Sequence, residues 1–537
     1  MNRRDFLGSV TAALVAAPKR SAAMDPVTSG SGRPPNLLFI ISDQFRGDAM
    51  SCAGNSMLPT PNLDRLAREG VRFADSNCAF PVCVPSRTEI LTGRSTANTH
   101  VYGNDAAKDT VRNRGVSFDN LLHDRGYRSF YYGKFHSPYK LARAYDNKVA
   151  SIPRLPGVPN EHAEFLAYLD RHVPRRAPRK GELIDASYER PYRPYPVDTY
   201  YEQAQHGMVA DKKGGRHGKQ RSQQGVIGVV DVPAEYSHAS FPVNESTLQV
   251  LGEMKEKPFN LTCSIDPPHP PFLAVQPYAE MFPAAEMPLP KNLKPAGRWS
   301  PYRLRAETMA HYHNAAYVQQ FTSAYYAMVR DVDHQIGRIL ARLDELKLAQ
   351  NTLVIFTADH GEMLGSHGLV SKMVFYQEAV RVPLLMRMPG VIAPGTVVNH
   401  PVCGRDLFAT ILDYMGVKSP GSDGDSLRPL IDGNASAGPD YRVSEWATDP
   451  ARRSNVPNFM VRTADWKLMM ADSPESHAVD ALYDMKNDPY EMQNLLGPPS
   501  DRAKYAGQAD EMKQRLIAWL ERVHSPFVAS VKARKLA

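Results

Sequence analysis

The sequence predicts an α/β protein: a doubly wound, mostly parallel sheet with helices on both faces, followed by a small C-terminal α+β subdomain with an antiparallel sheet. Short continuous apolar runs, such as 37–41 and 352–357, have the composition of strands that are buried on both faces. Amphipathic helical patterns lie between these runs, and this alternation is typical of a parallel sheet. A change of pattern in the last hundred residues indicates the separate subdomain.

The elements of the predicted α/β domain, residues 34–440, follow from local patterns. An amphipathic helix near 62–70 leads into a strand. Residues 117–136 repeat the arrangement, with a helix, Gly126 and a strand in succession. A long helix that begins near residue 333 precedes the strand at 352–357.

Two regions depart from this alternation. Residues 140–240 are rich in Arg, Tyr, Pro and His, so we expect an insertion or a set of long loops rather than core. This region is expected to line the substrate entrance, and the alternative is a solvated basic loop. In the predicted C-terminal subdomain, 441–537, residues 458–470 and 480–496 have the pattern of hairpin strands. Residues 509–524 have the pattern of an amphipathic helix.

Charge and cysteine content restrict the class of protein. The 537-residue chain has a formal net charge of +7. Residues 1–23 hold four basic residues and Asp5, a balance of +3, which leaves +4 for the rest. This mild bias favours anionic partners but does not indicate nucleic-acid binding. Five cysteines without a CxxC pair do not indicate a disulfide scaffold, although one or two bridges remain open.

The N-terminus has the pattern of an export signal. In MNRRDFLGSVTAALVAAP, Arg3 and Arg4 precede a short run of small apolar residues, and further small residues follow at Ser21–Ala23. The run is too short to span a bilayer. Residues 1–23 are therefore predicted to be a twin-arginine signal peptide, and the mature protein to be periplasmic or secreted and not membrane-spanning. The alternative is a buried N-terminal helix.

Polar residues follow two of the predicted strands. Asp43 and Gln44 come after one strand, and Asp359 and His360 after the other. Ligands collect at the carboxyl ends of strands in a doubly wound sheet, so these residues could converge on one cation. Asp after a strand is also common turn chemistry.

Further candidates lie in three other stretches. His269 lies in the proline-rich segment DPPHPPF, where prolines would stiffen the backbone around the imidazole; the alternative is a surface polyproline turn. Lys134 and His136, two residues apart after a strand, suit an anion site or a solvated strand end. Lys372 follows the DHGE segment after a short loop, and a lone lysine is usually solvated.

The most specific motif is CVPSRTEILTGR, Cys83–Arg94. A structural cysteine needs neither a proline two residues later nor an arginine four residues later. With DQ upstream, and GKFH, PHPP and DHGE…K downstream in this order, the chain resembles the type I, formylglycine-dependent sulfatase family of the alkaline phosphatase superfamily. The resemblance covers nearly the whole mature chain and includes the C-terminal LYDMKNDPYEMQNL.

The resemblance implies that Cys83 does not act as a thiol. In this family a separate maturation enzyme, which reads Pro85 and Arg87, oxidises the cysteine to formylglycine. The aldehyde hydrates to a geminal diol. One hydroxyl is then the nucleophile, and the other later expels sulfate as the aldehyde re-forms. A serine has only one hydroxyl, so it cannot release sulfate by re-forming an aldehyde.

The resemblance also assigns roles to the other candidates. Asp43, Gln44, Asp359 and His360, together with the side chain made from Cys83, match the ligands of one divalent metal. Arg87 and Lys134 would hold the formylglycine and stabilise charge, and His136 matches the base that collapses the covalent intermediate. His269 and Lys372 match groups that grip the sulfate, and one of them protonates the leaving alcohol.

The predicted ligand set departs from the commonest family pattern. Many relatives use three Asp and one Asn, whereas this chain has Gln44 and His360 and only two carboxylates. Ca²⁺ is the expected metal from the resemblance, with Mn²⁺, Mg²⁺ or Zn²⁺ as alternatives. Fewer anionic oxygens weaken calcium binding, and imidazole suits manganese, iron or zinc better.

The sequence thus predicts an exported sulfatase that hydrolyses an O-sulfate ester, with a carbohydrate as the expected carrier of the sulfate. One alternative is a phosphonate monoester or phosphodiester hydrolase with the same nucleophile. A second is a non-catalytic protein that binds sulfated glycans. The expected partners are the sulfated substrate and the maturation enzyme.

Overall fold

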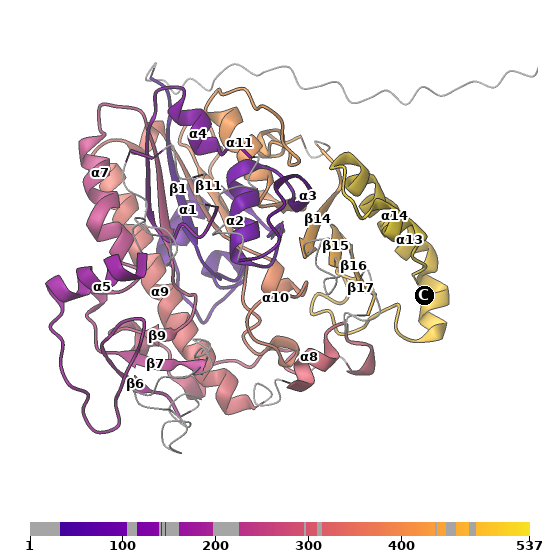
Figure 1. Cartoon of the computed structure of the whole chain (residues 1–537), viewed down its shortest axis with the longest axis horizontal. Coiled ribbons are helices and arrows are strands. Elements are labelled where there is room, and N and C mark those ends of the chain that lie inside the picture. Colours follow the sequence, from indigo (N-terminus) through magenta and orange to yellow (C-terminus); the bar gives the residue numbers. More distant parts are fainter. Residues whose placement is uncertain are drawn as a thin grey trace, which may run out of the picture.

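The computed structural model describes most of the chain, namely residues 33–104, 115–138, 141, 145–146, 161–196, 225–294, 297–308, 314–434, 436, 438–446, 458–471 and 479–536. Figure 1 shows a large α/β body with a smaller subdomain beside it, formed by the C-terminal part of the chain. The expected signal peptide, residues 1–23, lies outside the described residues and stays a prediction.

A seven-stranded sheet forms the centre of the body, in the order β12-β2-β11-β10-β1-β8-β4. β1 (Asn36–Ser42) pairs in parallel with both β10 (Thr352–Ala358) and β8 (Phe259–Ile265), and β8 pairs in parallel with β4 (Arg128–Gly133). The sheet is therefore mostly parallel, as predicted. The remaining strands are β2 (Val71–Phe73), β11 (Leu384–Arg387), which is antiparallel to its neighbours, and β12 (Thr396–Val398).

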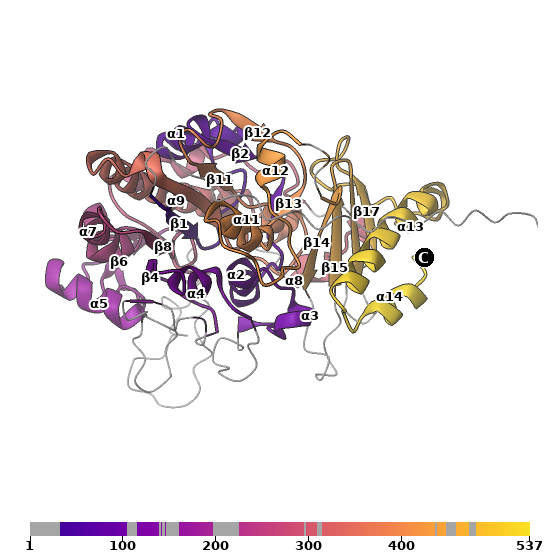
Figure 2. The ribbon, with the colours of Figure 1, turned by 90° about the horizontal axis from the view of Figure 1, so that it is seen from above.

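Helices cover both faces of the sheet, because alternate residues of a strand point to opposite sides. Leu38 and Ile40 of β1 belong to one core, and Phe39 and Ile41 belong to the other. Figure 2 shows the two helical layers. The first layer contains α1 (Pro61–Arg68), α7 (Leu248–Glu253) and α9 (Ala315–Glu345), and the second contains α2 (Cys83–Thr92), α4 (Phe118–His123) and α11 (Asp406–Tyr414).

The C-terminal subdomain is a four-stranded antiparallel sheet with one helical layer. Its strands follow the order β14 (Tyr441–Trp446), β15 (Asn458–Thr463), β16 (Trp466–Ala471) and β17 (Ala481–Asp484). Leu516 and Leu520 of α13 (Pro499–Arg522) lie in one core with Val461 and Leu468 of the sheet, and α14 (Val528–Ala533) follows. The predicted hairpin strands and amphipathic helix are thus present.

A buried arginine links this subdomain to the α/β body. Arg405 Nη2 lies 2.7 Å from Glu89 Oε2 of α2 and 3.6 Å from Glu445 Oε1 of β14. The Arg405 guanidinium also lies 4.7 Å from the ring centroid of Trp519 in α13. Because all these groups are buried, the subdomain is fixed against the helix that begins with Cys83.

The region 140–240 is not made of long loops alone, which corrects the expectation. It contains α5 (Glu161–His172), β5 (Leu183–Ile184), β6 (Pro191–Pro194) and β7 (Ile227–Val230). β7 pairs in parallel with β9 (Phe272–Ala274), so the three strands and β9 form a second, four-stranded sheet. Pro191 is the first residue of β6, a position where a strand tolerates proline, so the proline content of this region does not exclude a strand.

Short elements complete the fold: β3 (Ser76–Asn77), β13 (Val402–Cys403), α3 (Thr96–Thr99), α8 (Arg303–Thr308), α10 (Gln377–Val380) and α12 (Arg428–Ile431). All five cysteines are free thiols. Within the described ranges, no helix combines the length and the apolar character needed to cross a bilayer.

Candidate active site

The structure brings the ten predicted site residues together at the carboxyl edge of the central sheet. Asp43 follows β1, the Lys134–His136 segment follows β4, His269 follows β8, and Asp359 follows β10. These strands are parallel neighbours, so their carboxyl ends meet at one edge. The rest of the set comes from the adjacent loops and from α2, namely Gln44, Cys83, Arg87, His360 and Lys372.

Cys83 lies at the centre of this set, as the first residue of α2. Its Sγ atom is 3.1 Å from His360 Nε2, 3.4 Å from Lys372 Nζ and 3.8 Å from Asp43 Oδ1. Pro85 lies in the first turn of the helix, where no backbone N–H is needed for the helical ladder. The thiol therefore occupies the position around which the charged groups are arranged.

The backbone conformation at the end of α2 accounts for Gly93, the glycine near the end of the same motif. Gly93 ends α2 with φ 64, a left-handed conformation that favours glycine. A Cβ at this position would lie 2.5 Å from Ser422 Oγ and 2.8 Å from a ring carbon of Phe408. A side chain at position 93 would thus push α2, and Cys83 with it, away from its packing.

Arg87 joins the two acidic strand ends. Its Nε donates to Asp359 Oδ2 at 2.8 Å, and one terminal nitrogen donates to Asp43 Oδ2 at 3.2 Å. The other terminal nitrogen donates to the Lys134 carbonyl and to Ser264 Oγ, both at 2.9 Å. Such a planar fork can position two carboxylates at once.

Lys134 is held between two carboxylates. Its Nζ lies 2.9 Å from Asp43 Oδ2 and 2.7 Å from Asp266 Oδ1. Burial opposes the lysine charge, but Asp266 and Asp43 raise the pKa of Lys134 well above its usual value. Burial likewise acts against the charge of Asp43, yet Lys134 and the other nearby cations hold the pKa of Asp43 well below its usual range.

The site favours negative charge at the position of the Cys83 sulfur. Burial and the Asp43 carboxylate raise the pKa of the Cys83 thiol. Lys372, His360 and a hydrogen bond with His136 outweigh them and hold this pKa well below its usual range. An oxygen nucleophile at this position would be stabilised in its anionic form by the same groups.

The residues fit a divalent cation. Ligand atoms of Asp43, Cys83, Asp359 and His360 all lie within 4.8 Å of one another, and all four side chains are buried. Burial and the Asp43 carboxylate raise the pKa of Asp359, in spite of Arg87 and His360. Two buried carboxylates that repel each other, beside an imidazole, form a donor set for a hard or borderline divalent metal.

Gln44 completes this cluster in an unusual backbone conformation, with φ 63. Its N–H donates to Asp359 Oδ1 at 3.1 Å, and Tyr325 Oη donates to its carbonyl at 2.7 Å. Its side-chain oxygen accepts from Lys372 Nζ at 2.6 Å, and its Nε2 donates to Glu362. The amide is thus held from both ends.

The two histidines lie in restrained backbone segments. His136 has φ 37, and its buried Nδ1 has no hydrogen-bond partner among the described residues. His269 Nδ1 lies 2.9 Å from the Pro270 carbonyl, which only accepts, so Nδ1 carries hydrogen and Nε2 is left for a ligand. Burial, Lys134 and Lys372 lower the pKa of His269 to about 4.

The sequence interpretation missed two acidic residues of the site. Asp266 follows β8 and pairs with Lys134, and Glu362 follows His360 by two residues and binds Gln44. The strand-end argument that singled out Asp43 applies equally to Asp266, so this signal was available. Glu362 gave no such signal, since its role depends on a partner 318 residues away.

A second acidic cluster contains its own cation. Ligand atoms of His367, Glu378 and Glu491 lie within 4.8 Å of one another. Lys467 Nζ lies 2.6 Å from Glu491 Oε1, and both side chains are fully buried. This ammonium offsets the charge of one of the two glutamates, so the cluster contains an ion pair beside a second carboxylate and an imidazole.

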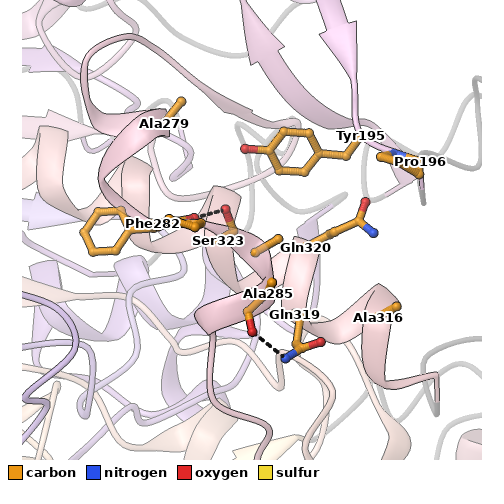
Figure 3. Close-up of a pocket in the computed structure, with 11 residues that line it drawn as sticks. Tyr195, Pro196, Ala279, Phe282, Ala285, Ala316, Gln319, Gln320 and Ser323 are labelled. Carbon is orange, nitrogen blue, oxygen red and sulfur yellow. Dashed lines mark hydrogen bonds between the residues drawn. The ribbon is translucent and has the colours of Figure 1, made fainter.

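A cavity of about 460 Å³ lies apart from these clusters (Figure 3). Tyr195, Phe282 and residues of α9 line it, and Gln319 donates to the Ala285 carbonyl there. All the lining residues are Tyr, Phe, Pro, Ala, Gln or Ser, so none is charged. The cavity therefore has no group that neutralises a sulfate or phosphate, in contrast to the surroundings of Cys83.

Comparisons with known proteins agree with this geometry. The family model described as Sulfatase matches residues 35–417, and that described as N-sulphoglucosamine sulphohydrolase, C-terminal, matches residues 365–521. An ulvan-active sulfatase from Formosa agariphila is 26% identical over 471 residues, which cover 87% of this chain and 78% of that protein.

Solved structures share the fold. A phosphonate monoester hydrolase of Agrobacterium radiobacter superimposes with a TM-score of 0.68 at 22% identity, covering 91% of this chain and 96% of that one. A protein solved with its substrate D-glucosamine-2-N,6-O-disulfate gives a TM-score of 0.64 at 22% identity, covering 92% and 98%. The family match spans most of the sequence, and the motifs that it contains meet in one site. The chain therefore belongs to the sulfatase family of sulfuric ester hydrolases, in the alkaline phosphatase superfamily.

Proposed function

We propose that the protein is an exported sulfatase that removes an O-sulfate group from a carbohydrate, with a formylglycine made from Cys83 and one divalent metal. The arrangement around Cys83 carries the proposal. Its Sγ stands where the formylglycine oxygens would be, with His360 and Lys372 within 3.4 Å. Asp43 and Asp359 would hold the metal with His360 and Gln44, and the metal would lower the pKa of the attacking hydroxyl and neutralise sulfate oxygens.

The cationic side chains would stabilise the transferred group. Arg87 and Lys134 are fixed by Asp43, Asp359 and Asp266, so they need little reorganisation when negative charge develops. Lys372 Nζ lies 3.4 Å from the Cys83 sulfur. These groups would hold the sulfate in line with the nucleophile and would compensate its charge during transfer.

The histidines and Lys372 would handle protons. His136, whose interaction with the Cys83 side chain lowers the pKa of that group, would take a proton from it and so restore the aldehyde. His269 and Lys372 would grip the sulfate, and one of them would protonate the leaving alcohol. A bound sulfate anion favours the charged form of His269, against the burial that lowers its pKa.

The burial of the motif bears on maturation. Cys83, Pro85 and Arg87 lie in α2, whose residues are all buried. A maturation enzyme that reads these residues would have to act before the chain folds. The twin arginine at Arg3–Arg4 supports export through the Tat route, and a carbohydrate substrate is supported by the ulvan-active relative.

One observation favours a second candidate, hydrolysis of phosphonate monoesters or phosphodiesters. Gln44 and His360 stand where many sulfatases have an Asp and the Asn, respectively, and similar substitutions occur in some sulfatases and in phosphonate monoester hydrolases of the superfamily. Lys134 and His136 argue for the sulfatase instead, because the Lys-x-His pair at this point is the sulfatase pattern.

A substrate panel separates the two candidates. We expect kcat/KM to be higher for an aryl sulfate than for a phenyl phosphonate ester or an aryl phosphodiester on the same preparation, and we expect release of sulfate from at least one sulfated mono- or disaccharide. Higher turnover of the phosphorus esters, without release of sulfate from any sugar, would favour the second candidate.

We expect His269→Ala to slow a sugar sulfate by about 10²–10⁴-fold, the usual contribution of a positioned acid, and an activated aryl sulfate much less. A sugar alkoxide is a poor leaving group and needs the proton. Measuring kcat for both substrates checks this. The matched control is His400→Ala, since His400 Nδ1 lies 3.0 Å from the following proline carbonyl as His269 does, but outside the site. Equal loss on both substrates would assign the proton to Lys372.

A further inference from the structure

The ligand set raises the question of why an amide, rather than a carboxylate, follows Asp43. Glu362 lies against the Gln44 side chain and is fully buried. We propose that Glu362 is a positioning residue that selects an amide at position 44 and turns its oxygen toward Lys372 and the proposed metal. This inference rests on the role of Gln44 in the proposed function.

Three hydrogen bonds fix the Glu362 carboxylate. One oxygen accepts from the backbone N–H groups of Leu364, at 3.1 Å, and Ser371. The other accepts from Gln44 Nε2. Glu362 thereby ties the Asp43–Gln44 loop to the segment that carries Lys372, the residue after Ser371. Because both oxygens of Glu362 act as acceptors in these contacts, the atom of residue 44 that faces the carboxyl group has to be a donor.

The position of the Gln44 amide oxygen is then determined. With Nε2 directed to Glu362, Oε1 points the opposite way and accepts from Lys372 Nζ at 2.6 Å. The same Lys372 Nζ lies 3.4 Å from Cys83 Sγ, so the amide oxygen faces the center of the site. Without Glu362, an amide can reverse its oxygen and nitrogen at little cost, and the reversed form would present N–H groups to two cations.

The backbone conformation of Gln44 restricts the direction of its side chain. Its left-handed φ of 63 is held by the Asp359 carboxylate on the N–H and by Tyr325 on the carbonyl. The side chain leaves the backbone in a fixed direction, between Glu362 and Lys372. A glutamate at position 44 would place one carboxylate oxygen against Lys372 and the other against Glu362, both of which are buried.

The test is an exchange of the two residues. In metal-free protein, Glu362→Gln would place two N–H₂ groups against each other, and Gln44→Glu would place two carboxylates against each other. Each should lower Tm by about 1–3 °C. The double variant Gln44→Glu/Glu362→Gln restores a donor opposite an acceptor, with the partners reversed. Its Tm should return to within about 0.5 °C of that of the original protein.

Metal binding gives the second readout, with Ca²⁺ and Mn²⁺ as calorimetric probes. Glu362→Gln should raise the dissociation constant at least about 10-fold, because the oxygen of Gln44 is no longer fixed; this is the usual effect of losing a group that orients a ligand. The double variant should bind at least as tightly as the original protein. Asp119→Asn is the matched control, because Asp119 is a fully buried carboxyl that bonds Tyr145 and Asn260 near the opposite end of β8.

The outcomes are distinguishable. Additive losses of Tm in the double variant, or unchanged metal binding in Glu362→Gln, would overturn the positioning role. If the original protein binds neither cation, the proposed metal is wrong, and the Tm values of the metal-free variants still decide whether Glu362 selects an amide at position 44.

Discussion

Replacing Cys83 with alanine is expected to abolish hydrolysis of every sulfate ester and to leave the fold intact. The loss of kcat should be at least about 10⁴-fold, as for other enzymes that lose their nucleophile. The thiol is surrounded by charged groups and not by a tightly packed apolar core, so its removal costs little packing. The measurements are kcat on an aryl sulfate and Tm by circular dichroism.

A serine at position 83 gives a more specific result. It has one hydroxyl and no route back to an aldehyde, so it can accept a sulfuryl group but cannot release it. We expect Cys83→Ser protein, incubated with substrate, to gain about 80 Da, the mass of one sulfuryl group in ester linkage. Multiple turnovers by this variant would contradict the proposed chemistry.

Cys78→Ala is the control for both variants. Cys78 is as buried as Cys83, and its Sγ lies 3.9 Å from the Ala379 carbonyl. We expect this substitution to keep full activity. Wild-type activity in Cys83→Ala protein would refute the assignment of the nucleophile.

Asp359→Asn is expected to remove the metal and to lower kcat by at least about 10³-fold, the scale of losing a principal electrostatic stabiliser. The substitution keeps the shape of the side chain but removes one of the two carboxylates in the cluster. It also weakens the ion pair between Asp359 Oδ2 and Arg87 Nε, which lie 2.8 Å apart. Metal analysis of purified protein should find about one equivalent in the original chain and much less in the variant.

Chelation of the original protein provides the control for this prediction. Removal of the metal should abolish activity, and addition of a divalent cation should restore it, whereas the Asp359→Asn variant should not recover. Full activity in protein whose metal content has been shown to be negligible would contradict the proposed metal.

The strand ends of the site could be predicted from sequence because they depend on local patterns. The apolar runs that became β1 and β10 mark buried strands, and neighbouring parallel strands end at the same edge. The convergence of Asp43 and Asp359 follows from that alone. The region 140–240 was read as loops because Pro and Arg mask its short strands, which are recognised only from their partners.

Other parts of the site depend on contacts between distant segments. All residues of α2 are buried, so no amphipathic pattern marks it as a helix, and Cys83 was found through the family motif. Glu362 and Gln44 are 318 residues apart, and no local pattern predicts such a pair. The donor on Gln44 and the acceptor on Glu362 become informative only when the fold brings them into contact.

The mass of the tryptic peptide 73–87 from catalytically active protein tests the central claim most directly. If formylglycine replaces Cys83, this peptide is about 18 Da lighter than the peptide with two cysteines, and fragmentation assigns the loss to position 83 and not to Cys78. The account predicts that the lighter peptide increases in proportion to sulfatase activity across preparations. Active protein in which Cys83 is an unmodified thiol would contradict it.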